Sequence, residues 1–336
     1  MKIIIDAMGG DNAPREIVKG AVMARRELGH DIVLVGRREE LEACLKDEGC
    51  ADMSIVDARE VISMEDDPST ATRRKKDASM TVALRLLAEG EGDAVVSAGS
   101  TGALLTGATL IVKRVRGIRR AALAPVLPAG EHGVMLIDCG ANAECTAEYL
   151  LQFACMGSIY ASKLMGCEKP RVGLLNVGTE DTKGGELQHQ AFALLKKAHE
   201  EGVINFIGNV EGTGVFSGQA EVIVSDGFTG NVLLKTTEGV IKFMMGQLKD
   251  VFYKKTANKL AAAVLKGDLA RMKKALDVNE VGGTALVGIS KPVIKAHGSS
   301  KASAVFAAVR QAVAFAQSGI SGEIEANIEH MKLKAE

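Results

Sequence analysis

The chain repeats one short arrangement six times: an apolar run, then a small polar loop rich in glycine, then a stretch whose apolar residues have helical spacing. Apolar runs without alternation are typical of strands buried on both faces, as in parallel sheets. Strands that alternate with amphipathic helices predict a layered α/β fold. The six run-and-loop segments read KIIIDAMGGDNAP, DAVVSAGSTG, VMLIDCGANAE, VGLLNVGTEDTKGG, NFIGNVEGTG and EVIVSDGFTGN.

Helical spacing is clear between the loops, where apolar residues recur every three or four positions. No low-complexity linker and no repeat of fixed period interrupts residues 1–336, so we expect a single α/β domain. The residues on the two clearest apolar faces are Leu187, Ala191, Leu194, Leu195 and Ala198, and Leu233, Val240, Ile241, Met244 and Leu248.

Chain direction predicts where a site would lie. In open parallel sheets, ligands bind beyond the carboxyl ends of the strands, and each of the six polar loops follows a strand. Any one polar residue there is explained as a helix cap or a turn residue. Six such loops at one sheet edge nevertheless predict a polar cleft. The loops contribute Asp6, Asp11, Asn12, Ser97, Ser100, Thr101, Asp138, Asn142, Glu144, Asn176, Thr179, Glu180, Lys183, Asn209, Asp226, Thr229 and Asn231.

Two glycine loops bear on anion binding. The loop with Gly9–Gly10 has neither the dinucleotide pattern G-x-G-x-x-G nor the phosphate-loop pattern G-x-x-x-x-G-K-[ST]. In SAGSTG, Gly99 and Gly102 flank Ser100 and Thr101 ahead of a predicted helix. That loop predicts either an anion held by free backbone N–H groups or a tight turn with a helix cap.

The strongest anion site by plain chemistry is the KAHGSS segment, residues 295–300. Gly298 permits close approach of the backbone, and Ser299 and Ser300 offer hydroxyl and N–H groups at the start of a predicted helix. A phosphate site is favoured here over a basic surface loop, because no acid lies nearby in the sequence. The cationic neighbours are Lys291, Lys295, His297 and Lys301.

A basic amphipathic helical hairpin is predicted over residues 250–277. Gly267 and Asp268 break its apolar pattern, which then resumes. Between residues 254 and 274, seven basic residues stand against one acid, although the whole chain has a net charge of −1. Such a segment predicts contact with a membrane surface, packing in a dimer, or both. The predicted apolar tip comprises Leu260, Val264 and Leu265.

Composition excludes several classes of protein. A net charge of −1 and the absence of tryptophan argue against a nucleic-acid binder. The six cysteines form no CxxC pair, so free thiols in a reducing cytosol and no metal site are expected. Neither a signal peptide nor an apolar run of about 18 residues is visible, so a soluble intracellular protein is expected. No pattern for a covalent nucleophile is present.

Nine blocks, taken in order from residue 3 to about residue 315, resemble the bacterial phosphate acyltransferase family of phospholipid synthesis. The resemblance implies a three-layer α/β/α fold with a mainly parallel sheet, like that of isocitrate and isopropylmalate dehydrogenases, and a homodimer. It implies transfer of a long-chain acyl group from acyl carrier protein to inorganic phosphate without a cofactor. The blocks are IDAMGGDNAP, KKDASM, SAGSTGALL, IDCGANAEC, NVGTEDTKG, IGNVEG, SDGFTGNVLLKTTEG, NEVGGTALVG and KAHGSS.

The family's place in metabolism sets further expectations. Its acyl phosphate product would feed a membrane glycerol-3-phosphate acyltransferase, so a cytoplasmic protein at the membrane surface is expected. The carrier protein is acidic, so a basic docking patch is expected as well. Residues 73–76 and 114–120 are both candidates, which the sequence does not rank.

The resemblance and the chemistry together suggest roles. Lys183, with the loop around His297 and Ser299, would bind phosphate or the oxyanion, and His297 would protonate the leaving thiolate. Asn231 and the amides of DGFTGN would orient the thioester, and Asp226 would position a neighbour. The further residues predicted to bind substrate or phosphate are Asp6, Gly9, Gly10, Asp11, Ser97, Gly99, Ser100, Thr101, Gly102, Asn142, Gly178, Thr179, Gly227, Thr229 and Gly230.

Asp6 and Asp11 have the wrong charge for gripping phosphate. We expect them to accept hydrogen bonds from loop amides, to orient a lysine, or to meet the amides of a pantetheine arm. Three other functions stay open: a phosphotransacetylase acting on short acyl-coenzyme A, a nicotinamide-dependent decarboxylating dehydrogenase, and a non-catalytic membrane scaffold.

Overall fold

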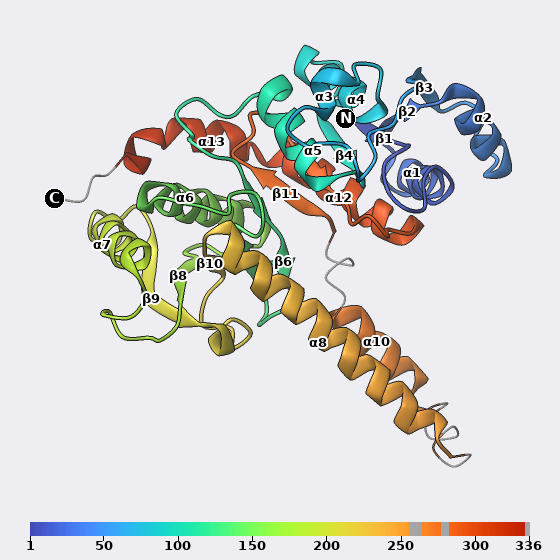
Figure 1. Cartoon of the computed structure of the whole chain (residues 1–336). Coiled ribbons are helices and arrows are strands. Elements are labelled where there is room, and N and C mark those ends of the chain that lie inside the picture. Colours follow the sequence, from blue (N-terminus) through green and yellow to red (C-terminus); the bar gives the residue numbers. More distant parts are fainter. Residues whose placement is uncertain (256–257, 259–261, 263, 277–281, 333–336) are drawn as a thin grey trace.

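The computed structural model describes residues 1–255, 258, 262, 264–276 and 282–332. In these residues, two sheets lie at the centre of the molecule, and helices cover them (Figure 1). A long helical arm extends away from this body.

The larger sheet has seven strands in the order β3-β2-β1-β4-β12-β11-β5. The strands from β3 to β12 run parallel, whereas β11 is antiparallel to both neighbours. Hence β1, β4 and β12 end side by side, although β12 comes late in the chain. The strand bounds are β1 Lys2–Asp6, β2 Asp31–Gly36, β3 Ser54–Asp57, β4 Ala94–Ser97, β5 Ala122–Ala124, β11 Thr284–Val287 and β12 Val293–Lys295.

The smaller sheet has five strands in the order β6-β7-β10-β8-β9, all parallel except β6. The mainly parallel pairing agrees with the prediction. The expectation that all six loops share one sheet edge is wrong, because the chain leaves the larger sheet at β5 and enters the smaller one at β6, with Pro125 between them. The strand bounds are β6 Val126–Leu127, β7 Val134–Ile137, β8 Arg171–Asn176, β9 Asn205–Glu211 and β10 Val222–Val224.

Helices on both faces complete three layers. Ile3 and Ile5 of β1 belong to the core shared with α1 and α12, whereas Ile4 between them packs in the core with α4. Successive side chains of a strand point to opposite faces, so β1 is buried on both, as its sequence predicts. The main helices of the body are α1 Arg15–Leu28, α2 Arg38–Asp47, α4 Ser79–Glu89, α6 Ala147–Leu164, α7 Glu186–Glu200 and α12 Ala302–Ser318. Shorter ones are α3 Ala71–Arg74, α5 Thr101–Gly107, η1 Ala108–Val112, η2 Gly212–Gly214, α13 Ile320–Ala326 and η3 Ile328–Met331.

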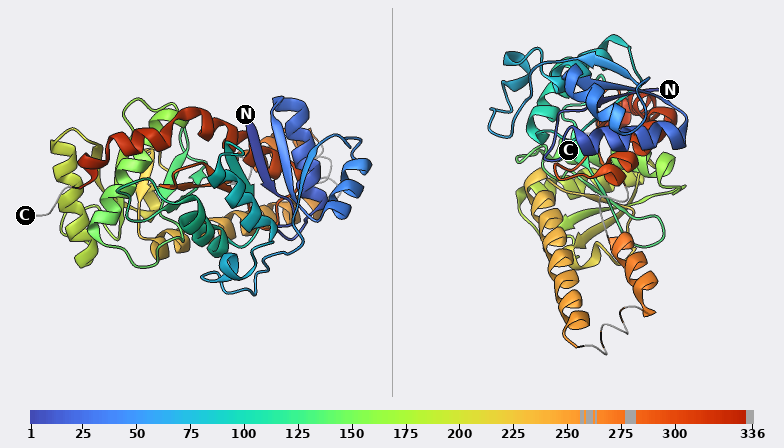
Figure 2. Two further views of the ribbon diagram at one scale, coloured as in Figure 1. Left: turned by 90° about the horizontal axis from the view of Figure 1, so that it is seen from above. Right: turned by 90° about the vertical axis from the view of Figure 1, so that its right-hand side faces the viewer.

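The arm consists of α8 (Gly227–Tyr253), which starts at the smaller sheet, and α10 (Lys266–Leu276) near its outer part (Figures 1 and 2). The predicted break at Gly267 and Asp268 is wrong, since both lie at the start of α10, and the first arm begins well before residue 250. Val264 is 84% exposed and Leu265 is 41% exposed, whereas Leu260 lies outside the described residues. The two helices flank a cavity of about 460 Å³ lined by Met245, Leu248, Lys249, Phe252, Tyr253, Ala262, Lys266 and Leu269.

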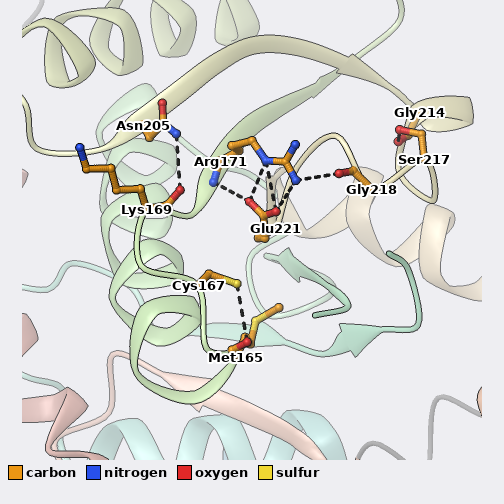
Figure 3. A network of polar contacts seen from close by, with 9 residues as sticks. All are labelled: Met165, Cys167, Lys169, Arg171, Asn205, Gly214, Ser217, Gly218 and Glu221. Atoms are coloured by element: carbon orange, nitrogen blue, oxygen red, sulfur yellow. Dashed lines mark hydrogen bonds and ion pairs between the residues drawn. The ribbon is translucent and has the colours of Figure 1, made fainter. Parts of the chain in front are cut away.

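Arg171 and Glu221 fasten the amino-terminal ends of β8 and β10 (Figure 3). The Glu221 carboxylate accepts a hydrogen bond from the Arg171 backbone amide at 2.7 Å and from its guanidinium, which also donates to the carbonyl of Gly218 at 2.7 Å. Burial opposes ionisation of Glu221, but the bonds from Arg171 outweigh it and lower the pKa of this carboxyl. The two strands pair in parallel from Val172 beside Val222 to Leu174 beside Val224.

Candidate active site

Asp6 closes β1 with a buried carboxylate. It accepts hydrogen bonds from the hydroxyl groups of Ser97 and Ser79, each at 2.6 Å. Burial raises the pKa of Asp6, and these bonds oppose the shift. Gly9 lies against the same group, where a Cβ atom would come 2.5 Å from Oδ2. Asp6 and Ser97 are each only 1% exposed. They therefore support the loops through buried hydrogen bonds and have almost no surface that a substrate could contact.

The loop after β12 is fastened to the loop after β1. The amide of Asp11 donates to the carbonyl of Gly298 at 2.8 Å, and the side-chain amide of Asn12 donates to the carbonyl of Ser299 at 3.1 Å. Gly10, with φ +102°, passes so close that a Cβ atom would lie 3.0 Å from the Gly298 oxygen. The sequence suggested no acid near this loop, but the fold places the Asp11 carboxylate beside Gly298.

The first backbone amide of the helix that follows this loop already has a hydrogen-bond partner within the protein. α12 begins at Ala302, whose amide donates to the carboxylate of Glu16 at 2.8 Å. Lys291 also lies elsewhere, since its ammonium donates to the carbonyl of Leu87 at the end of α4 at 2.7 Å. These two groups are therefore not free for an anion, and the predicted anion site stays a prediction that depends on the other groups of the loop.

His297 and Ser299 are both exposed in that loop, and Ser299 orients the His297 ring. The amide of Ser299 donates to Nδ1 at 3.2 Å, and the hydroxyl oxygen of Ser299 lies 2.8 Å from the same nitrogen. A ring that accepts at Nδ1 carries its proton on Nε2 when it is neutral. His297 therefore presents an N–H at Nε2, the form needed for a proton donor.

Asp138, directly after β7, organises the part of the site on the smaller sheet. Its completely buried carboxylate accepts from the amides of Leu123 at 2.9 Å and Asn142 at 2.7 Å, and from the Asn142 side chain at 2.9 Å. Burial raises the pKa of Asp138, and the bonds from Asn142 and the loop amides oppose this. The Asn142 carbonyl accepts from the amide of Gly227 at 2.8 Å, so this loop positions the start of α8.

The first turn of α8 is capped by Asp226. Its carboxylate accepts from the amide and the hydroxyl of Thr229, both at 2.8 Å. Gly227 touches the backbone of Asn142, where a Cβ atom would come within 2.6 Å of the carbonyl oxygen. Asn231 follows with an exposed side chain. Cap and close contact together fix the direction in which α8 leaves the sheet.

A cavity of about 140 Å³ lies where the two sheets meet. The larger sheet contributes Thr101, Lys295 and His297, and α8 contributes Asn231 and Lys235. The structure thus brings together two of the predicted catalytic residues, Asn231 and His297. The other lining residues are Leu123, Pro125, Val126, Cys139, Leu234, Glu238, Gly282, Gly283 and Thr284.

Two lysines, Lys235 and Lys295, line this cavity, and Lys235 was not predicted from the sequence. Lys235 stands four residues after Asn231, and that spacing on one helical face is the signal that would have found it. Its ammonium pairs with Glu238 at 2.8 Å. Lys295 was expected among the cations of the predicted anion site, and the structure adds that it is only 8% exposed at the end of β12. Burial lowers the pKa of Lys295 to about 8.

Lys183 lies in a different loop, after β8. Its carbonyl accepts from the side chain of Asn176 at 3.0 Å, and its ammonium, 48% exposed, is 3.9 Å from the carboxylate of Glu180. Gly178 packs against this lysine side chain. Asn176 and Thr229 line a second cavity of about 540 Å³, so the first turns of α8 separate the two cavities. Lys183 is not among the residues that line the smaller one.

The SAGSTG loop has the geometry of a turn with a helix cap. The Ser100 hydroxyl accepts from the Ala103 amide at 3.5 Å, at the start of α5. A Cβ atom on Gly99 would come 2.6 Å from Met80, and one on Gly102 would come 2.8 Å from Pro68. A side chain at either glycine would therefore displace a neighbour, and Thr101 alone of this loop lines the cavity.

Three further observations concern the described part of the chain. It contains no helix long and apolar enough to cross a bilayer, and no group of three or more metal-binding side chains. All six cysteines are free thiols. Burial raises the pKa of Cys145 and Cys155 to about 12, so neither is a thiolate near neutral pH.

The fold is shared with solved phosphotransacetylases. A phosphotransacetylase from Streptococcus pyogenes aligns with a TM-score of 0.63 over 94% of both chains, at 18% identity. The EutD phosphotransacetylase from Staphylococcus aureus aligns with a TM-score of 0.60 over 96% of this chain and 94% of that one, at 17% identity. The chain thus has the α/β fold found in phosphotransacetylases.

Relatives in sequence cover nearly the whole chain. A family model described as "Fatty acid synthesis protein" matches residues 1–322. A phosphate acyltransferase from Lysinibacillus sphaericus is 44% identical, covering 99% of this chain and 100% of the relative. One from Thermoanaerobacter pseudethanolicus is 46% identical over 98% of both chains, and one from Bacillus cereus is 48% identical over 93% of both. The chain belongs to the phosphate acyltransferase family, which confirms the resemblance seen in its sequence.

Proposed function

We propose that this protein transfers a long-chain acyl group from the thioester of acyl carrier protein to inorganic phosphate, giving acyl phosphate for phospholipid synthesis. Relatives that cover the whole chain are named phosphate acyltransferases. The observation that carries the proposal is the cavity between the sheets, which has Asn231 on one side and His297 on the other. A two-sided polar site suits a reaction in which a thioester carbonyl and a phosphate must be held together.

The reaction needs no nucleophile from the protein. A phosphate oxygen attacks the carbonyl carbon of the thioester, a C–O bond forms, and the carbonyl oxygen becomes the oxyanion of a tetrahedral intermediate. The C–S bond then breaks, and the thiolate takes up a proton to leave as the free carrier thiol. The protein supplies positioning, charge stabilisation and that proton.

Asn231 and His297 divide these tasks in the proposal. The Asn231 amide orients the thioester at the first turn of α8, whose direction Asp226 fixes through Thr229. His297, held by Ser299, gives its Nε2 proton to the thiolate. Lys183 keeps the predicted role of binding phosphate or the oxyanion, and its half-exposed ammonium leaves it able to turn toward a substrate.

The basic stretch at residues 114–120 is the better docking surface for an acidic carrier protein. At residues 73–76, Lys75 is already paired with Asp66 at 2.6 Å. The stretch 114–120 holds four basic residues, and none of them forms an ion pair within the described part of the chain. Its last residue precedes Ala121, whose carbonyl accepts from the Asn142 side chain at 2.9 Å, so the surface adjoins a site loop.

Contact with the membrane and pairing as a homodimer are further parts of the proposal, for a protein of the cytoplasm. Val264 and Tyr253, near the outer end of the arm, are 84% and 64% exposed, and basic residues flank them. Apolar side chains with cationic neighbours suit a lipid interface. Val240 and Met244, exposed along α8, suit a second copy of the arm. At the membrane, acyl phosphate would pass to a glycerol-3-phosphate acyltransferase.

The test is an assay with palmitoyl-acyl carrier protein, run with and without inorganic phosphate. Release of the carrier thiol should require phosphate, and hydroxylamine should trap the acyl phosphate. A preference for acetyl-coenzyme A would instead assign a phosphotransacetylase. Release without phosphate would identify a thioesterase, and no release from folded protein would favour a scaffold.

A further inference from the structure

Lys295 is a buried cation that faces the cavity between the sheets. It ends β12, next to Ser97 of β4 in the larger sheet, and its side chain is part of the cavity lining. The ammonium donates to the carbonyl oxygens of Ala98, at 3.5 Å, and Ala296. An ammonium has three N–H donors, so one remains for a further partner.

No carboxylate in the described residues lies within ion-pair distance of Lys295. The charged groups that face it are Asp6 and Asp11 from β1 and its loop, Lys235 from α8, and His297 from its own loop. Asp6 is already bound to two hydroxyl groups. A buried charge is costly unless a counter-ion or hydrogen bonds offset it. This site therefore favours an anion from outside the protein.

The cavity offers what a small oxyanion requires. Thr101 and Thr284 add neutral donors to the two lysines, and the one carboxylate of the lining, Glu238, is paired with Lys235. A cavity needs about 10–15 Å³ to hold one water molecule, so a cavity of about 140 Å³ has room for a tetrahedral oxyanion.

We propose that inorganic phosphate binds in this cavity with Lys295 as its buried counter-ion and Lys235 on the facing wall. The proposal rests on the proposed function and deepens it, because it assigns the nucleophile to a pocket that does not include Lys183. From this cavity a phosphate oxygen can attack the thioester carbonyl that Asn231 orients, while His297, which lines the same cavity, protonates the leaving thiolate.

Binding and kinetics of Lys295→Met test the assignment. Phosphate affinity, measured by calorimetry without an acyl donor, should fall about tenfold or more, and the KM for phosphate should rise equally. The KM for palmitoyl-acyl carrier protein should change less than twofold. Lys291→Met is the matched control, since this lysine contacts the end of α4, and it should bind phosphate normally. Normal phosphate affinity in a folded Lys295→Met protein would overturn the assignment.

A second measurement avoids the risk that Lys295→Met fails to fold. Near pH 8.5, phosphate binding to the wild-type protein should take up protons, because the anion favours the charged form of Lys295. Calorimetry in two buffers of different ionisation enthalpy measures this uptake. Lys295→Arg, which stays charged, should bind phosphate without it. Equal uptake by both proteins would contradict the role of Lys295, whereas a wild-type enzyme that needs no phosphate for turnover would instead refute the proposed function.

Discussion

A Cβ atom on Gly230 would lie 2.0 Å from the backbone carbonyl oxygen of Asp138, so the first turn of α8 rests directly on the end of β7. No side-chain rotation relieves a contact with backbone. Gly230 thereby fixes the position of Asn231, the next residue.

Gly230→Ala should push the start of α8 away from β7. We expect a loss of about 1–3 kcal/mol in the free energy of unfolding. Turnover should fall about a hundredfold, because Asn231 moves with the helix. Urea unfolding and steady-state assays measure both.

The matched control is Gly239→Ala in the same helix, where a Cβ atom meets nothing within 4 Å. The control should leave stability unchanged or raise it by up to about 1 kcal/mol. Equal effects of the two changes would disprove the contact's importance.

Lys183→Ala should lower turnover about a hundredfold if this ammonium contacts phosphate or the oxyanion. The melting temperature should not change, because the side chain is half exposed and its nearest carboxylate is 3.9 Å away. Lys196→Ala, on the exposed face of α7, serves as the control. A near-normal rate for Lys183→Ala would remove this lysine from the mechanism.

His297→Asn should slow the reaction of palmitoyl thioesters by about a hundredfold or more, because the leaving thiolate loses its proton donor. The deficit should largely vanish with a nitrothiophenyl thioester, whose leaving group departs without protonation. Stopped-flow rates for both donors give the comparison. The same deficit with both donors would show that His297 acts in binding rather than in proton transfer.

Val264→Glu combined with Leu265→Glu should abolish binding to anionic liposomes, because two charges replace exposed apolar side chains at the outer end of the arm. Liposome flotation provides the measurement. Val177→Glu, at a residue that is 81% exposed far from the arm in sequence, controls for added charge and should still float. If the double variant also floats, the arm serves the dimer alone, which analytical ultracentrifugation would reveal.

Arg116→Glu combined with Arg119→Glu should raise the KM for acyl carrier protein about tenfold at low salt, and the difference should shrink as salt is added. Arg73→Glu with Arg74→Glu should raise it less than twofold. The acyl-coenzyme A reaction should respond to neither change. A larger effect at residues 73–74 would move the docking surface there.

Local patterns predicted much of the fold. The apolar run of β1 indicated a strand buried on both faces, and the structure divides Ile3 and Ile4 between two cores. The second sheet was not predictable in this way, because its existence depends on which strand edges pair after Pro125. Such pairings join residues far apart in the sequence, and no local pattern encodes them.

The candidate site, like the fold, was predicted only in part from the sequence. Asn231 was predicted because it belongs to a polar loop segment that follows an apolar run, and His297 because it belongs to the basic KAHGSS segment. The blocked start of α12 was missed, because its partner Glu16 lies 286 residues away in the chain. The burial of Lys295 was missed for the same reason, since its surroundings come from β1, β4 and α8.

α8 is a continuous helix of 27 residues, about 40 Å long, with Asn231 in its first turn and the outer end of the arm at its other terminus. A helix of this length is stiff, and it is fixed to the body of the protein where Gly230 contacts the backbone of Asp138. On the proposed function, a bilayer or a second arm that displaces the outer end would displace Asn231 as well. The seating of the protein on a membrane would then influence its turnover through this one helix.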